Sequence, residues 1–364
     1  MSSPSDALAD VSQRLDTFFA SRRSEAEEAG PEAALLIAAA TAAVGGGKRL
    51  RARFCLAGWR SVATARGPVA DVPPEAIGAA AALEVFHAAA LVHDDLVDNS
   101  DTRRGRPSAH RSLEAQHGDA GWSGDAAAYG RASAILLGDL LVAWSDDLLE
   151  ESLADAAPSA ARTARAEYAR MRRDVTIGQY LDVAEESAFR TAPDAEHAAR
   201  ALRVASLKSA RYSVQQPLLI GATLAGADAA QRRALADFGH PLGMAFQLRD
   251  DVLGVFGDEA LTGKPSGDDL REGKRTVLVA YAREALQPGP RRVLDELVGD
   301  PGLDAAQIAA LQATIVESGA LARVEELIAG YARDADRALA GAPLGHAAVG
   351  ELRDLARAAA AREA

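Results

Sequence analysis

The sequence has a single cysteine, Cys55, in 364 residues. A disulfide framework is therefore excluded, and a reducing, cytoplasmic location is expected. Aromatic residues make up 5% of the chain, and runs in which β-branched and polar residues alternate are missing, which argues against a β-sheet protein. Alanine, the residue with the highest helix propensity, is abundant instead. The composition thus favours helices.

Basic residues are too few to balance the acidic ones. Against 52 Asp and Glu there are 40 Lys and Arg, which gives a formal net charge of −12. Nucleic acids require a basic surface, so no nucleic-acid partner is expected. A long uninterrupted apolar run is also missing, because Glu84 and His87 interrupt the most apolar stretch, residues 76–93. We expect neither a membrane span nor a signal peptide.

Hydrophobic residues nevertheless make up 48% of the chain, enough for a buried core. Their spacing is helical in segments separated by breaks that contain glycine and proline. We predict an all-α bundle of about ten or more helices that forms a single domain over residues 1–364. The predicted helices span 31–44, 76–98, 132–150, 160–186, 198–226, 231–256, 275–286, 305–318 and 320–340. Residues 1–30 and 341–364 are interpreted as amphipathic or frayed ends, and 288–301 as turns.

A first acidic segment, His93-Asp94-Asp95-Leu96-Val97-Asp98, ends an apolar helix. On a helix Asp94 and Asp98 lie about 40° apart on one face, whereas Asp95 points about 100° away. Carboxylates crowded at the negative end of a helix repel one another, and a bound cation would relieve this cost. Oxygen ligands of this kind suit Mg²⁺, which shares phosphate oxygens with substrates. Taken alone, the segment is equally compatible with a solvated helix end.

A second acidic segment, residues 247–254 (QLRDDVLG), also follows an apolar helical run. Two such helix ends in one chain are much less expected by chance than one. A third acid pair, Asp146-Asp147, has no basic cluster beside it and is interpreted as solvated surface.

Basic clusters accompany both acidic segments. They are RRGRP at 103–107 after the first, GK at 263–264 and GKR at 273–275 after the second, and GGKRLR at 46–51 near the start. Guanidinium and ammonium groups beside carboxylate–Mg²⁺ sites are what a diphosphate needs. The sequence has neither a Walker A motif nor a G-x-G-x-x-G motif after a strand, so no nucleotide cofactor is indicated.

In this order the motifs resemble those of the trans-isoprenyl diphosphate synthases, the polyprenyl synthetase family, over about residues 35–285. The matching segments are GGKRLR (46–51), EVFH (84–87), HDDLVD (93–98), RRGRP (103–107), GDLL (138–141), GQYLD (178–182), KS (208–209), FQLRDD (246–251) and GK (263–264 and 273–274). The resemblance implies a helical bundle around a central apolar cavity, and a homodimer. It also implies a Mg²⁺-dependent prenyltransferase that condenses isopentenyl diphosphate head to tail (1′-4) with dimethylallyl, geranyl or farnesyl diphosphate.

The same resemblance implies roles for individual residues. The metal site, with three Mg²⁺ ions, would use the acids of the two motifs: Asp94, Asp95, Asp98, Asp250 and Asp251. The allylic diphosphate would also contact Arg103, Lys208 and Lys264. Isopentenyl diphosphate would bind to Lys48, Arg51, His87 and Arg104. Further substrate contacts are implied for Ser209, which stands where the family usually has threonine, and for Gln247 and Lys274.

The second motif departs from the family pattern at Gly254, where an aspartate is usual. Because Asp250 is intact, we expect activity to survive. Ala89 and Ala90 are small residues one turn before Asp94 and would leave the cavity open, and Phe86 is the first bulky residue that could form its floor. We therefore predict geranylgeranyl diphosphate, with twenty carbons, as the product.

Other functions are less well supported by the sequence. A longer or shorter product remains open. A class I terpene cyclase shares the acidic helix and Mg²⁺ but needs no second diphosphate site. A non-catalytic prenyl synthase subunit would be expected to lose metal-binding acids, and a purely structural helical protein leaves the charged clusters unexplained.

Overall fold

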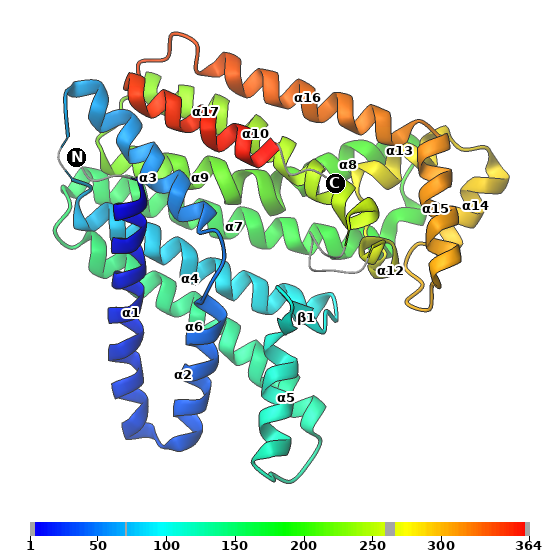
Figure 1. Cartoon of the computed structure of the whole chain (residues 1–364), viewed down its shortest axis with the longest axis horizontal. Helices are drawn as coiled ribbons and strands as arrows, with labels where there is room; N and C mark the ends of the chain where they lie inside the picture. The colour runs from blue at the N-terminus through cyan, green and yellow to red at the C-terminus, as the bar shows by residue number, and fades with distance from the viewer. Residues whose placement is uncertain (1–3, 70, 259–265, 361–364) are drawn as a thin grey trace. The chain divides into compact units, whose positions relative to one another are not determined.

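The computed structural model describes residues 4–69, 71–258 and 266–360. The chain divides into two compact units (Figure 1): one comprises residues up to Arg165 with Ile220–Gly226, and the other comprises Ala166–Leu219 with the residues from Ala227 onward. The predicted all-α class is confirmed, since the strands in the described part are a two-residue antiparallel pair, β1 (Thr102–Arg103) and β2 (Arg106–Pro107). The single domain stays a prediction.

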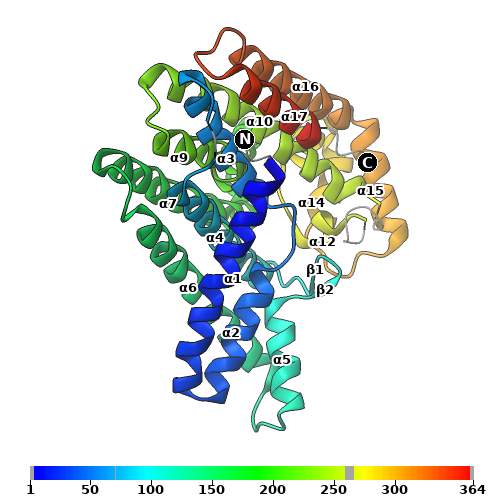
Figure 2. The ribbon, with the colours of Figure 1, turned by 60° about the vertical axis from the view of Figure 1, so that its left-hand side comes forward.

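The first unit is built on two long apolar helices that pack along each other (Figure 2), α4 (Pro74–Val97) and α6 (Ala126–Leu153). They approach closely because Gly138 of α6 has no side chain: a Cβ there would lie 2.6 Å from Cε1 of His93 and closer still to Nε2. The other helices of this unit are α1 (Pro4–Ala29), α2 (Pro31–Val44), α3 (Leu50–Ala63) and α5 (Ala109–Asp119), with a 3₁₀ turn at Thr64–Arg66.

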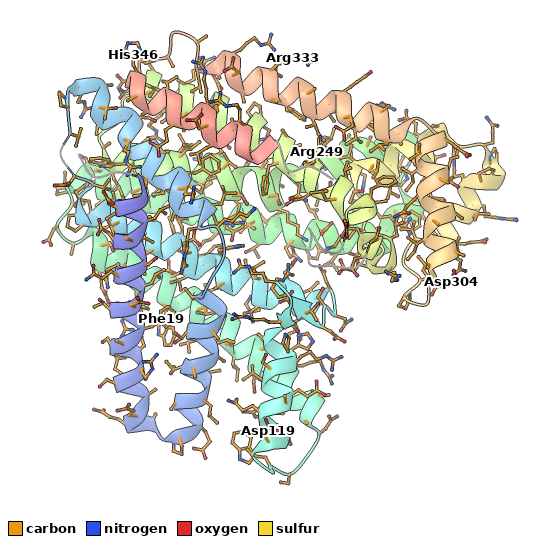
Figure 3. The ribbon with its side chains drawn as sticks, viewed as in Figure 1. Phe19, Asp119, Arg249, Asp304, Arg333 and His346 are labelled. Carbon is orange, nitrogen blue, oxygen red and sulfur yellow. The ribbon has the colours of Figure 1, made fainter. Side chains whose placement is uncertain are left out.

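Aromatic side chains fix α1 on this pair of helices. Phe19, labelled in Figure 3, and Phe18 each meet the ring of Trp144 edge to face, at centroid distances of 5.8 and 6.2 Å. Edge-to-face pairs add to the stability that apolar burial provides. The N-terminal segment is therefore an ordered helix from Pro4 onward and not a frayed end.

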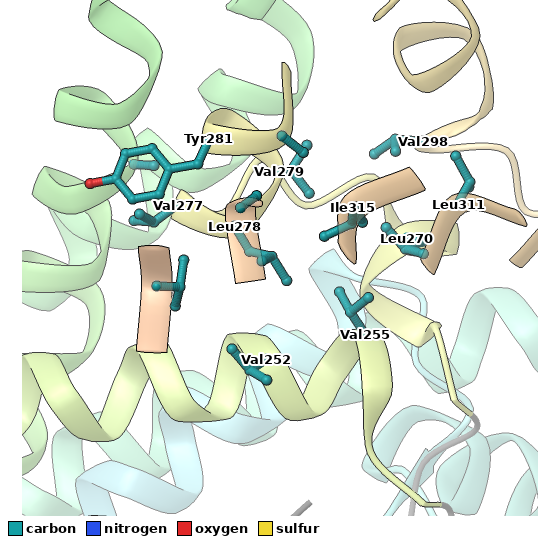
Figure 4. Packing of buried hydrophobic residues seen from close by; sticks show 14 of the residues in the cluster. Val252, Val255, Leu270, Val277, Leu278, Val279, Tyr281, Val298, Leu311 and Ile315 are labelled. Carbon is teal, nitrogen blue, oxygen red and sulfur yellow. The ribbon is translucent and has the colours of Figure 1, made fainter. Parts of the chain in front are cut away.

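The second unit is organised around α10 (Ala229–Phe256), against which α16 (Ala320–Ala338) packs. Arg249 of α10, labelled in Figure 3, donates to both carboxylate oxygens of Glu325 at 2.6 and 2.7 Å. Figure 4 shows the apolar cluster of this unit, in which Val252, Leu270 and Leu278 are buried. The remaining elements are α7 (Pro158–Ala188), the 3₁₀ turns Phe189–Thr191 and Asp194–Glu196, α8 (His197–Val204), the π-helix η4 (Ala205–Gln215), α9 (Gln216–Leu224), α12 (Asp268–Glu272), α13 (Val277–Ala285), α14 (Pro288–Leu297), α15 (Ala305–Glu317) and α17 (His346–Ala360).

The predicted helices are present, and the structure adds α3, α5 and α12, which were not predicted. It differs from the prediction in three further places. The segment predicted as one helix over 198–226 contains the π-helix Ala205–Gln215. Residues 288–301, predicted as turns, contain α14, because a proline at the first helical position lacks only an N–H that has no intrahelical partner there. The C-terminal segment forms α17 from His346.

Two helices, α4 and α6, are long and apolar enough to cross a membrane by length and composition alone. The apolar window of α4 is 78% buried, as expected of a core helix, whereas that of α6 is 28% buried. Helix α6 exposes Ile135 and Leu136, at 47% and 62%. The absence of a membrane span stays a prediction.

Candidate active site

The first acidic segment lies at the C-terminal end of α4. The N–H of Asp98 donates to the carbonyl of Asp94 at 2.8 Å, so the two residues are one helical turn apart as predicted. Asp95 is 3% exposed, and Arg103 from β1 donates to its Oδ1 through Nε at 2.7 Å and through Nη2. The same Nη2 lies 3.4 Å from Oδ2 of Asp94. The hairpin β1–β2 thus brings a guanidinium onto the acidic helix end.

The pairing separates the roles of the three acids. Burial lowers the pKa of Arg103, but the hydrogen bond to Asp95 and the charges of the neighbouring carboxylates outweigh this and raise it, so the guanidinium stays charged. Asp95 is committed to Arg103, while the side chain of Asp94 is 21% exposed. This geometry favours Asp94 and Asp98 as metal ligands and gives Asp95 a part in positioning Arg103.

A basic cluster surrounds the start of α3 in the same unit. The guanidinium of Arg104 lies against Gly47, where a Cβ would be 2.9 Å from Nη2, and its Nη1 donates to the carbonyl of Gly45 at 3.3 Å. Arg49 and Arg104 have φ of 50° and 54°. A left-handed backbone at a residue other than glycine costs free energy and is concentrated at functional sites. Lys48 precedes α3 in this same turn.

His87 and Glu84 of α4 complete this cluster. Burial, followed by the charges of Arg51 and Arg104, holds the pKa of His87 well below its usual value, so the imidazole is neutral at physiological pH. Glu84 is 6% exposed; its Oε1 accepts from the N–H of Ala52 at 3.0 Å. The structure therefore brings Arg51, His87 and Arg104 together as predicted. From the sequence we did not predict that Glu84 accepts a hydrogen bond from the start of α3. An acidic residue inside an otherwise apolar helix could have indicated such a contact.

The second unit holds Lys208 and Ser209 on the π-helix η4. Two glycines let this backbone pass close to its neighbours: a Cβ on Gly178 of α7 would lie 2.7 Å from the carbonyl carbon of Leu207, and one on Gly243 of α10 would lie 2.6 Å from Cα of Ala210. π-Helical turns are rare in proteins, and those that do occur are often found at functional sites. Nζ of Lys208 lies 2.6 Å from Oδ2 of Asp182 on α7, which fixes its direction.

The second acidic segment lies in the last turns of α10. Asp251 is 8% exposed and accepts from Nε2 of Gln247 at 2.7 Å. Burial, then the charge of Asp269, raises the pKa of Asp251 to about 8, although the hydrogen bond from Gln247 acts in the opposite direction. In the metal-free protein Asp251 is therefore mostly protonated at neutral pH. Asp250, which is only partly buried, is the better-placed ligand of the pair.

The remaining predicted phosphate contacts are lysines that follow this helix. Nζ of Lys274 lies 2.6 Å from Glu272 and 4.0 Å from Asp269. Lys264 lies outside the described residues.

The residues predicted to set product length lie on α4. Phe86 is 5% exposed and Ala89 is completely buried, while Ala90 is partly buried. Phe86 and Ala90 are one turn apart and share a face. The central apolar cavity and the part of Phe86 as its floor stay predictions.

Oxygen donors in these segments fit Mg²⁺. Among the residues that the structure describes, no group of three acidic, histidine or cysteine side chains could by itself enclose a metal ion. Mg²⁺ is usually held by one or two carboxylates, with waters and substrate phosphates completing its octahedron. The pair Asp94 and Asp98, and Asp250 in the other unit, match that pattern.

The chain is similar to known proteins in sequence and in fold. The model of the polyprenyl synthetase family matches residues 33–315. The geranylfarnesyl diphosphate synthase of Aeropyrum pernix is 31% identical over 311 residues, 85% of this chain and 88% of that enzyme. The geranylgeranyl diphosphate synthase of Sulfolobus acidocaldarius is 34% identical over 222 residues, 61% of each chain. The structure of a geranylgeranyl pyrophosphate synthase from Corynebacterium glutamicum, complexed with isoprenyl diphosphate and magnesium, has a TM-score of 0.90 at 35% identity over 97% of this chain and 98% of that one.

Proposed function

This chain belongs to the polyprenyl synthetase family of prenyltransferases, and we propose that it condenses isopentenyl diphosphate with an allylic diphosphate to an all-trans product, geranylgeranyl diphosphate. The observation that carries the proposal is that each unit holds a cation on a carboxylate that is electrostatically linked to an acidic segment. Asp95 holds Arg103 beside Asp94, and Lys208 is held by Asp182, whose charge also acts on Asp251. Charges fixed in this way need no reorganisation when negative charge develops on a leaving group.

The metal-binding part of the proposal uses Asp94 and Asp98 of the first unit and Asp250 of the second. Bound Mg²⁺, three ions with substrate present, supplies electrostatic stabilisation of the departing diphosphate. Arg103 and Lys208 add fixed positive charge, and Lys264 is proposed to do the same. Gln247 keeps Asp251 in place through the 2.7 Å hydrogen bond, and Lys274 is oriented by Glu272.

Isopentenyl diphosphate is proposed to bind to the basic cluster at the start of α3. Lys48, Arg51 and Arg104 supply positive charge, and the guanidinium of Arg104 is held against Gly47 and the carbonyl of Gly45. His87 is neutral there, so it acts as a hydrogen-bonding group. No side-chain base is required, because the proton lost after condensation can pass to the released diphosphate.

The length of the product is proposed to depend on Phe86. Its replacement by alanine removes the first bulky side chain below Ala89 and Ala90 and is expected to shift products beyond twenty carbons. Mass spectrometry of the dephosphorylated products checks this. A product distribution identical to that of the unchanged enzyme would show that Phe86 is not the floor.

The reaction itself is tested by incubating the purified protein with isopentenyl diphosphate, Mg²⁺ and each of the dimethylallyl, geranyl and farnesyl primers. Formation of a twenty-carbon product that EDTA abolishes is the expected result. Asp94→Asn is expected to slow the reaction by about 100-fold or more, because a charge that binds metal is lost. Asp147→Asn, at an exposed acid on α6, is the matched control and should retain full activity. Failure to elongate any primer would overturn the proposal.

A further inference from the structure

The π-helix η4, which carries Lys208, packs against α10. A Cβ on Gly243 of α10 would lie 2.6 Å from Cα of Ala210, and one on Gly239 would lie 2.9 Å from Cα of Gln215. Two glycines of α10 thus allow the backbone of η4 to approach closely at two points. A glycine presents no side chain that could form a directed contact, so the register of η4 on α10 has to be fixed by other groups.

A hydrogen bond between two side chains joins the start of η4 to α10. Oγ of Ser206 lies 2.8 Å from Nε2 of His240, and both residues are partly buried. Burial, followed by the charge of Arg211, lowers the pKa of His240, so the imidazole is neutral at neutral pH. A neutral imidazole has one donor and one acceptor nitrogen, and a hydroxyl can serve as the partner of either. The hydrogen bond is therefore compatible with both tautomers of the ring.

The helical hydrogen bonds of α10 are interrupted beside His240. The next residue, Pro241, has no N–H, so the carbonyl of Asp237 receives no helical hydrogen bond from it. One residue earlier, the carbonyl of Ala236 accepts from Nε2 of Gln215, the last residue of η4, at 3.2 Å. Side-chain hydrogen bonds thus tie both ends of η4 to this one region of α10.

On α7, two ion pairs hold the other side of η4. Nζ of Lys208 lies 2.6 Å from Oδ2 of Asp182, and Nη1 of Arg211 lies 3.1 Å from Oδ2 of Asp174. Helical residues two apart do not share a face, which agrees with Ser206 contacting α10 while Lys208 contacts α7. Because only one residue separates them, a shift of Ser206 along α10 would move the ammonium of Lys208 relative to Asp182.

We propose that His240 and Ser206 form a positioning pair that fixes the start of η4 on α10 and thereby directs Lys208 at the diphosphate of the allylic substrate. The inference rests on the proposed function, because it assigns Lys208 to that diphosphate. The pair acts through the backbone of η4 and not by touching substrate. The basic cluster proposed for isopentenyl diphosphate belongs to α3 and α4 of the other unit, so the pair should influence one of the two substrates and not the other.

The test is steady-state kinetics with farnesyl diphosphate and isopentenyl diphosphate varied in turn. His240→Ala and Ser206→Ala are each expected to raise the KM for farnesyl diphosphate by about 3- to 10-fold, the effect of one lost hydrogen bond, and to leave the KM for isopentenyl diphosphate unchanged. His240→Gln offers an amide nitrogen near the place of Nε2 and should restore most of the loss. His346→Ala is the matched control: this histidine, labelled in Figure 3, is exposed at the start of α17 and should have no effect.

The double variant Ser206→Ala with His240→Ala shows whether the two residues act as one unit. Once one partner is gone the hydrogen bond is already lost, so the double variant should be no worse than the more impaired single variant. Two single losses that multiply in the double variant would overturn the inference. Ser206→Ala removes only a hydroxyl group, so the series stays decisive even if His240→Ala does not fold.

Equal increases in the two KM values, or a lower unfolding temperature with both KM values unchanged, would make the pair merely structural and would also overturn the inference. The outcome is separable from that of the proposed function. If the unchanged protein elongates no primer, the proposed function fails, and titration calorimetry of farnesyl diphosphate with Mg²⁺ on the same variants then decides the part played by His240. The inference predicts weaker binding by His240→Ala and recovery by His240→Gln, and equal affinities in all variants would refute it.

Discussion

At the scale of single residues, Asp95 is a buried carboxylate whose partner is Arg103. Removing one member of a buried pair leaves an uncompensated charge and costs about 3–5 kcal/mol. Arg103→Ala is therefore expected to lower the free energy of unfolding by about that amount, in addition to its effect on activity. Urea unfolding in the absence of substrate measures it.

Arg111→Ala provides the matched control for Arg103. Arg111 also pairs with two acids, Asp101 and Glu114, but its side chain is 42% exposed. Exposed pairs contribute about 0–1 kcal/mol, so this variant should be nearly neutral. If Arg103→Ala and Arg111→Ala lowered the free energy of unfolding by the same amount, a buried ion pair at Asp95 would be contradicted.

His87 predicts a pH dependence of stability. Its pKa is lowered in the folded state, so below the unfolded value of about 6.5 the unfolded chain takes up a proton that the folded chain does not. Stability should therefore fall as the pH drops below about 6.5, by up to about 1.4 kcal/mol per pH unit from this group. His87→Gln removes this contribution. Urea unfolding of both proteins between pH 8 and pH 5 measures it: stability curves that run parallel over the range would argue against a neutral His87 in the folded protein.

The sequence predicted the charged residues of the site better than their roles. The spacing of Asp94 and Asp98 along one helix is a local property and could be read directly. The pairing of Asp95 with Arg103 depends on the β1–β2 hairpin, and the position of Asp269 depends on the packing of α12 against α10. Contacts between elements of this kind are not encoded in residue spacing.

At the scale of elements, the first unit includes the seven-residue segment Ile220–Gly226 of α9 and the turn after it. A Cβ on Gly221 would lie 2.7 Å from the carbonyl carbon of Cys55 in α3, and closer still to its oxygen. The obstacle is backbone, which cannot rotate away. Gly221→Ala should therefore destabilise the protein by about 1–3 kcal/mol or more, measured as a fall in unfolding temperature.

Gly350→Ala is the control for that substitution. Gly350 is also helical, in α17, and nothing lies within 4 Å of a Cβ placed there. Alanine should stabilise that helix by about 0.5–1 kcal/mol. If both variants shifted the unfolding temperature in the same direction, the close approach of Gly221 to α3 would be refuted.

Most helices were predictable because their apolar residues recur with a helical period. What the sequence did not predict has local causes. Pro288 and the glycines and prolines around it suggested turns, yet proline is well tolerated at a helix start. The π-helix at Ala205–Gln215 has no sequence period of its own, since it arises where the backbone must fit between Gly178 of α7 and Gly243 of α10.

At the scale of the whole molecule, we propose a homodimer that covers the exposed apolar side of α6. Leu136 is 62% exposed there, and its neighbour Ile135 is 47% exposed. In a two-fold symmetric interface the same surface is used by both subunits, so a glutamate at position 136 would place a charge in the interface twice. Leu136→Glu is therefore expected to give monomers. Sedimentation velocity distinguishes a 37.9 kDa particle from one of twice that mass.

Val316→Glu is the control for the association state. Val316 is 50% exposed on α15, outside the proposed interface on α6. Its replacement by glutamate should therefore leave the dimer intact. A dimer that persists in Leu136→Glu would place the interface elsewhere.

The first unit is built from two separate segments of the chain, and this affects how it can fold during synthesis. Its last segment, Ile220–Gly226, is separated from Arg165 by the 54 residues from Ala166 to Leu219. A ribosome adding about 5–20 residues per second needs about 3–11 s to synthesise that interval. Throughout that time the N-terminal half lacks the segment Ile220–Gly226, which packs against the backbone of α3 at Cys55. The nascent chain therefore has an interval, which ends only when translation has passed Gly226, in which the first unit is incomplete and its uncovered surface can be bound by chaperones.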